Sequence, residues 1–160
     1  MKNERIPHPS ISIFAFSKQQ GLIPTSAYAR QARCYVNLEP VVWCSLTDSR
    51  ALCQILEDLI SRTVPEVGLS FDEVKATSVV ADKLGGAKTL LIDFDAYPGR
   101  YHLRILRSNS KGEWLGKPYA LEQVFPPDSS IEPVVLAIVN FMKTCKDLPE
   151  EANLPSTSVA

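Results

Sequence analysis

Two acidic residues at alternate positions, Asp93 and Asp95, are the residues whose type and spacing best suit chemistry. They close residues 90–95, where apolar and polar side chains alternate as in a strand with one solvated face. Side chains two positions apart on a strand lie about 7 Å from one another, so the two carboxylates could hold a divalent cation. No third ligand or general base accompanies them in the sequence. We therefore expect no metal site, and interpret the pair as a solvated strand face or as an acidic patch for a cationic partner.

Other reactive residue types lack the arrangement that their chemistry requires. Residues 85–89 (GGAKT) lack the first glycine of a phosphate-binding loop and precede a strand, so we expect a tight turn with positive φ. His102 has no neighbour in sequence that would orient its imidazole, and we expect it to face solvent. The widely spaced cysteines predict buried free thiols rather than zinc ligands; they are Cys34, Cys44, Cys53 and Cys145. We expect no catalytic residue and no cofactor.

Hydrophobic periodicity predicts the helices that must support these side chains. Residues 47–62 predict a helix that begins at Thr47 and Asp48, because apolar residues recur from Leu52 at intervals of three and four. A second helix is predicted over 131–145, capped by Ser129 or Ser130, with Pro133 in its first turn. A weaker apolar stripe favours helix within residues 70–84, and residues 77–80 fit a strand equally well.

The remaining elements are predicted to be strands. We expect strands at 11–16, 32–38, 40–46, 90–95 and 119–125, and a hairpin over 100–117. Residues 21–33 contain Pro24 and little periodicity, so they predict a long connection, and Glu39-Pro40 predicts a bend. Trp43 and Trp114 are expected in the sheet core, with Trp114, beside a hairpin turn, the more exposed of the two. The fold class is α/β (α+β): a single domain with a mixed or mainly antiparallel sheet and two principal packed helices.

Composition and charge restrict the class of protein. A chain of 160 residues with 45% hydrophobic and 22% charged residues predicts one globular domain, over residues 1–146, followed by a polar, flexible tail over 147–160. The first residues lack the apolar run of a secretory signal, and no segment is long enough to cross a bilayer, so we expect a cytoplasmic protein without a membrane partner. The net charge of −1 disfavours direct nucleic-acid binding.

Several segments together resemble a known family. They are Phe14-Ala15-Phe16-Ser17-Lys18, Tyr28-Ala29-Arg30-Gln31-Ala32-Arg33-Cys34, Glu39-Pro40-Val41-Val42-Trp43 before Thr47-Asp48, and Phe125-Pro126-Pro127-Asp128 before the last helix. In this order they resemble one group of bacterial contact-dependent growth inhibition (CDI) immunity proteins, over most of residues 11–143. The resemblance implies a small cytoplasmic protein that binds a cognate C-terminal toxin domain, often a nuclease, and neutralises it without catalysis by occluding its active site.

The resemblance assigns no contact residues, so the partner-binding residues are chosen from charge. Residues 47–95 hold nine acidic and five basic residues, the most acidic part of the chain. From it we predict Glu57, Asp58, Asp93 and Asp95 as partner-binding residues, with Tyr97 as an aromatic anchor. Two other functions remain open: a small metal-dependent hydrolase that uses Asp93 and Asp95, and an adaptor domain without a toxin partner.

Overall fold

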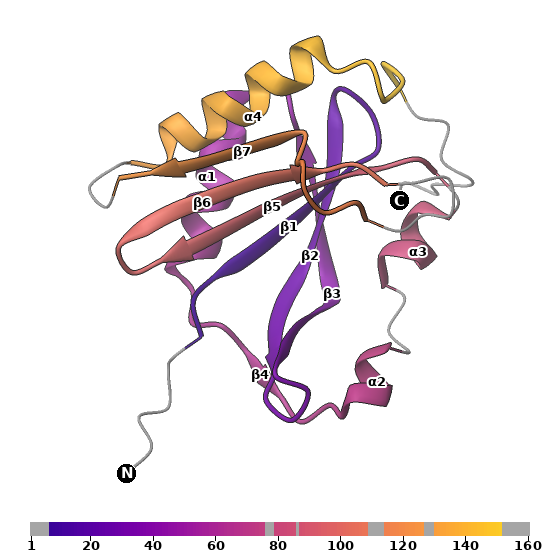
Figure 1. Cartoon of the computed structure of the whole chain (residues 1–160), viewed down its shortest axis with the longest axis vertical. Coiled ribbons are helices and arrows are strands. Elements are labelled where there is room, and N and C mark those ends of the chain that lie inside the picture. Colours follow the sequence, from indigo (N-terminus) through magenta and orange to yellow (C-terminus); the bar gives the residue numbers. More distant parts are fainter. Residues whose placement is uncertain (1–6, 76–78, 86, 109–113, 127–129, 152–160) are drawn as a thin grey trace.

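A mainly antiparallel sheet organises the chain in a computed structural model that describes residues 7–75, 79–85, 87–108, 114–126 and 130–151 (Figure 1). Within these residues the sheet has seven strands in the order β3-β2-β1-β5-β6-β7, and β4 pairs with β2 in parallel. The strands are β1 (Ser10–Ala15), β2 (Gln20–Ala29), β3 (Cys34–Ser45), β4 (Glu66–Val67), β5 (Leu90–Tyr97), β6 (Arg100–Leu106) and β7 (Leu121–Phe125). The predicted fold class is confirmed.

Two long helices, α1 (Ser49–Ser61) and α4 (Glu132–Thr144), cover one face of the sheet, as Figure 1 shows. Asp48 begins α1 as predicted, since its carboxylate accepts a hydrogen bond of 3.1 Å from the Ala51 amide. The cap of α4 differs from our prediction, because Ile131 rather than Ser130 occupies the N-cap and its side chain accepts no hydrogen bond; Ser129 lies outside the described residues. The main core fills the space between these helices and the sheet, with Leu56, Ile138 and the inward residues of β1, β5 and β6.

The other face of the sheet, which we call the second face, has a smaller apolar cluster. Phe14, Phe16 and Leu22 pack there against Leu84 of α3 (Val79–Leu84). The short helix α2 (Phe71–Lys75) lies near the end of β2 and the beginning of β3 (Figure 1). The helix prediction for residues 70–84 is confirmed where the structure describes them. The cluster is small and open at its edge.

Both tryptophans lie at that edge rather than in the core, which corrects our prediction. Trp43 is 46% exposed and packs edge-on against Phe16, while Trp114 is 36% exposed and lies against Phe14. Strand periodicity correctly places Trp43 on a sheet face, but only the arrangement of the helices shows that this face has little cover.

Residues 21–33 were predicted to be a connection, but most of them form β2. Pro24 is compatible with a strand here because β1 pairs with β2 only at Phe14 and Ala15 and has diverged from it by Pro24. The missing amide hydrogen therefore breaks no ladder bond to β1. The two β segments predicted around Glu39-Pro40 are one strand, β3, which bulges at those two residues opposite Pro24 and Thr25.

The C-terminal half differs from the prediction in two places. β7, rather than residues 113–115, is the strand that pairs with β6 on the side away from β5. Of the described residues 114–117, Trp114 bridges to Ser108 and the Leu115 amide donates to the Arg107 carbonyl at 2.8 Å; residues 109–113 lie outside the described part. Residues 147–150 of the predicted tail pack on the domain, because Leu148 is buried and the Pro149 carbonyl accepts a 2.9 Å bond from the Lys18 amide. The rest of that tail, from 152, lies outside the described residues.

Candidate functional site

Asp93 and Asp95 of β5 share one guanidinium on the second face of the sheet. Arg104 lies opposite Asp93 in the β5–β6 register, and its Nη2 donates to Asp93 Oδ2 at 2.5 Å and to Asp95 Oδ2 at 3.3 Å. We call these three residues the carboxylate cluster. The two carboxylate side chains are only 18% and 7% exposed, so the solvated strand face that we predicted for them is wrong. The guanidinium lies where we considered a divalent cation.

The electrostatics of the carboxylate cluster favour an additional positive charge. Burial and the neighbouring Asp95 raise the pKa of Asp93, and Arg104 only partly opposes this effect. Burial alone would lower the pKa of Arg104, but a hydrogen bond with Tyr119 and the two carboxylates raise it overall. Two carboxylates therefore face one permanent cation. The Nε of Arg104 is buried and has no hydrogen-bond partner among the described residues.

His8, just before β1, covers one side of this cluster. Its Nε2 lies 3.0 Å from Asp95 Oδ1, and its ring stacks on Tyr97 with centroids 4.3 Å apart. Tyr35 of β3 donates its hydroxyl proton to the His8 carbonyl at 2.5 Å. Burial and the nearby Asp95 carboxylate raise the pKa of Tyr35 to about 12, so the hydroxyl stays neutral and keeps its proton.

Aromatic and cationic side chains extend this region along the sheet. The Arg100 guanidinium lies 4.7 Å from the centroid of the Tyr97 ring, and Tyr28 packs edge-on against Tyr35 at 5.4 Å. On β6, His102 pairs with Glu122 of β7 at 2.9 Å instead of facing solvent alone. Tyrosine and arginine are the residue types that most often contribute strongly to protein interfaces. The second face thus offers a charged, aromatic surface suited to binding another protein.

The five predicted site residues do not form one surface. Asp93, Asp95 and Tyr97 share the second face, whereas Glu57 and Asp58 belong to α1, which packs on the other face through Leu52 and Leu56. The Asp58 carboxylate is paired with Arg62, one helical turn later. The sheet therefore separates the two halves of the predicted acidic patch.

Sequence reasoning missed three contributors, Arg104, His8 and Tyr35. The first could have been found, because the Tyr97-Pro98-Gly99 turn predicts a β5–β6 hairpin in which Arg104 lies opposite Asp93. His8 and Tyr35 carry no such signal, since His8 meets Asp95 across 87 positions and Tyr35 meets His8 across 27. Only the tertiary fold brings them together.

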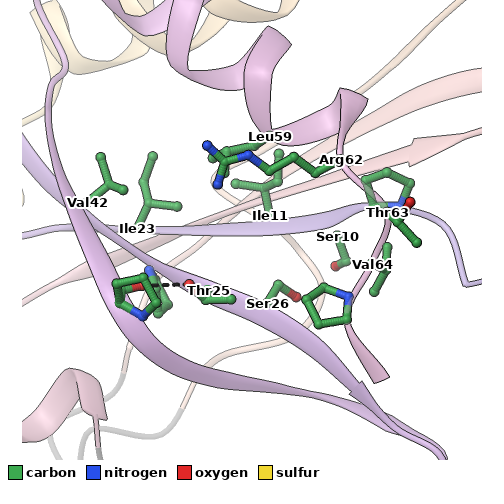
Figure 2. Close-up of a pocket in the computed structure, with 14 residues that line it drawn as sticks. Ser10, Ile11, Ile23, Thr25, Ser26, Val42, Leu59, Arg62, Thr63 and Val64 are labelled. Carbon is green, nitrogen blue, oxygen red and sulfur yellow. Dashed lines mark hydrogen bonds between the residues drawn. The ribbon is translucent and has the colours of Figure 1, made fainter. Parts of the chain in front are cut away.

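A separate pocket lies between β1, β2 and the end of α1 (Figure 2). Its volume is about 140 Å³, which has room for one side chain, and its wall is mainly aliphatic, with Ile11, Ile23 and Leu59. Thr25 Oγ1 donates to the Pro40 carbonyl at 2.6 Å on one side, and Arg62 extends along the opposite wall in Figure 2. None of the five predicted site residues is among the described residues that line it.

The described residues contain no group of three or more His, Cys, Asp or Glu side chains that could hold a metal ion. None of the described helices is long and apolar enough to span a bilayer. The four cysteines are free, and Cys44 and Cys145 are buried as predicted, whereas Cys34 and Cys53 are only half-buried.

Comparison with known proteins identifies a similar fold. No family model matches the chain, and no curated protein matches it. A protein of unknown function from Neisseria meningitidis, NMB0488, has a solved structure that resembles this one with a TM-score of 0.59. The two are 13% identical, and the match covers 91% of this chain and 100% of the other. This likeness shows the fold.

Proposed function

We propose that this chain is a cytoplasmic immunity protein of a bacterial CDI system, which binds the C-terminal toxin domain of its cognate effector and neutralises it. The proposal takes the family from the segments named in the sequence analysis. The observation that carries the binding mode is the carboxylate cluster, in which Asp93 and Asp95 share the single guanidinium of Arg104 beside the half-buried aromatic ring of Tyr97. Such a surface suits non-covalent binding of a basic protein.

Two features of the second face support a basic partner. The excess carboxylate charge draws a positively charged surface toward the sheet, so it raises the association rate and does so most at low ionic strength. Tyr97, which is half-buried between His8 and Arg100, provides an ordered aromatic ring at the edge of the cluster. An ordered ring loses little conformational entropy on binding, so it is suited to anchor a partner. Inhibition then follows from occlusion of the toxin's active site.

The test combines growth and binding kinetics with the toxin domain encoded beside this gene. Cells that express the toxin should survive only when the wild-type chain is co-expressed. Asp93→Asn should slow association about two- to fivefold at low salt, with a smaller effect at high salt. Tyr97→Ala should mainly raise the dissociation rate, by roughly tenfold or more. Glu57→Lys is the matched control, because Glu57 lies on α1, on the other side of the sheet.

The outcomes separate the family from the surface. If the wild-type chain neither protects cells nor binds the toxin domain, the immunity proposal is wrong. If it protects, but folded Asp93→Asn and Tyr97→Ala variants bind like the wild type while Glu57→Lys weakens binding, the α1 face is the interface instead.

A further inference from the structure

His8 is held more tightly than its position before the first strand requires. Its imidazole bonds Asp95 at 3.0 Å and lies between the rings of Tyr97 and Tyr35, with centroids 4.3 and 5.5 Å away. Its carbonyl accepts the Tyr35 hydroxyl proton at 2.5 Å. The next residue, Pro9, accepts a 2.9 Å bond from the Ala96 amide on β5. Together these contacts hold His8 and Pro9, just before β1, against the carboxylate cluster.

We propose that His8 and Pro9 form a pH-sensitive clasp, which closes over Asp95 and one face of Tyr97 when the His8 imidazole is protonated and loosens when it is neutral. In the closed state the ring covers Asp95, whose side chain is only 7% exposed. Opening the clasp frees a carboxylate oxygen and a tyrosine ring on the second face. The clasp itself is independent of the proposed function, whereas its effect on a partner rests on that function.

The charges around the ring determine the direction of the effect. The titratable and charged groups around His8 and the carboxylates it meets are Asp93, Asp95 and Tyr97 of β5, Tyr35 of β3, Tyr28 of β2, Arg100, His102 and Arg104 of β6, and Glu122 of β7. His102 lies opposite Asp95 in the β5–β6 register, and its ring is paired with Glu122. Without a proton on His8, Arg104 is the only arginine or lysine among the described residues that bonds Asp93 and Asp95. A protonated His8 imidazole adds a second positive charge, so the two carboxylates then face two cations, Arg104 and His8.

Arg100 opposes this effect, because its guanidinium lies on the Tyr97 ring and repels a second cation. Arg100 acts on His8 through the Tyr97 ring that both side chains contact, whereas Asp95 bonds the His8 ring directly at 3.0 Å. A charge-assisted hydrogen bond is about twice as strong as a neutral one, so the direct carboxylate contact outweighs the more distant guanidinium. Histidine gains its charge between about pH 8 and pH 5, so acidification closes the clasp.

The Ala96 amide reports the state of the clasp without any partner, because its hydrogen bond ends on Pro9. Its exchange with deuterium, measured by NMR and divided by the intrinsic rate, gives a protection factor. Ile92 is the matched reference amide, since it lies on the same strand opposite Ile13 and away from His8. We expect the protection of Ala96 relative to Ile92 to rise about threefold or more from about pH 8 to about pH 5.5.

Two histidine variants identify the responsible group, since the chain has only two histidines. His8→Gln keeps a hydrogen-bonding side chain but cannot take up a proton, so the relative protection of Ala96 should no longer change with pH. His102→Gln removes the other imidazole, which pairs with Glu122, and should leave the change intact. Relative protection that is independent of pH in the wild type, or that persists in His8→Gln, would overturn the clasp while leaving the immunity proposal untouched.

Discussion

Arg104 lies directly opposite Asp93 in the β5–β6 ladder, and the same guanidinium nitrogen that bonds Asp93 at 2.5 Å also reaches Asp95 at 3.3 Å. The carboxylates project from one face of β5, two positions apart, so one arginine from the neighbouring strand serves both. Because one guanidinium compensates two partly buried carboxylates, the stability of this part of the sheet depends strongly on Arg104.

Arg104→Met should lower the free energy of unfolding by roughly 2–4 kcal/mol at neutral pH, because it leaves two carboxylates buried without a cation. Urea denaturation provides the measurement. Arg62→Met is the matched control, since Arg62 also pairs with a carboxylate, Asp58, but both side chains are exposed. That variant should change stability by less than about 0.5 kcal/mol. Equal effects of the two substitutions would contradict the special role of Arg104.

The loss of unfolding free energy caused by Arg104→Met should become smaller as the pH falls. Asp93 already has a pKa above its ordinary value of 3.8, because of burial and the Asp95 charge, and without Arg104 that pKa rises further. A carboxyl group with a raised pKa in the folded state binds its proton more tightly there, so acid stabilises the fold through this group. This gain in stability develops as the pH falls from the raised pKa of Asp93 in the folded state to the ordinary value of 3.8. Denaturation at about pH 7 and about pH 5 tests the direction.

Ile138→Ala should destabilise the protein by roughly 2–5 kcal/mol through an internal cavity. Ile138 is fully buried on α4, within the main core. Leu136, on the same helix, is 51% exposed, so Leu136→Ala removes a comparable side chain without opening a cavity. Thermal or chemical denaturation of both variants checks the buried face of α4. A loss below about 1 kcal/mol for Ile138→Ala would mean that this face is packed differently.

Gly21→Ala should destabilise the fold by about 1–3 kcal/mol, because side chains of the neighbouring strands β1 and β3 leave no room for a methyl group on β2. A Cβ at Gly21 would lie 2.8 Å from Ile13 Cγ2 and 3.4 Å from the Cys44 sulfur. At Gly116 a Cβ would meet nothing within 4 Å, so Gly116→Ala is the comparison. Equal midpoints of unfolding for the two variants would show that β1 and β2 can separate at no cost.

The cysteines should react with a thiol reagent in a definite order. Burial raises the pKa of Cys44 to about 12, so its thiol should stay unmodified in the native protein at about pH 8. Partial burial, and then the carboxylates of Glu132 and Glu57, raise the pKa of Cys53. Glu57→Gln should therefore speed alkylation of Cys53, measured by mass spectrometry of the labelled peptides. An unchanged rate at Cys53, or early labelling of Cys44, would disagree with this arrangement.

Local patterns in the sequence were enough to predict several elements. The helices near 47–62 and 131–145, the strands at 11–16 and 90–95 and the positive φ of Gly85 follow from periodicity and turn chemistry, and the structure contains them. β2 was missed because Pro24 is unfavourable in most strands. Its tolerance here depends on β1 turning away, which is a property of two strands and not of one segment.

The sequence by itself determined the α+β class, the two helices with their buried stripes, and the placement of Asp93 and Asp95 on one face of a strand. Only the tertiary structure decided that this face is shielded by Arg104 and His8, and that Glu57 and Asp58 lie beyond the sheet. The physical reason is that strand and helix periods depend on neighbours within a few positions, whereas charge compensation depends on contacts between strands. His8 and Asp95 are 87 positions apart, and no local pattern relates them.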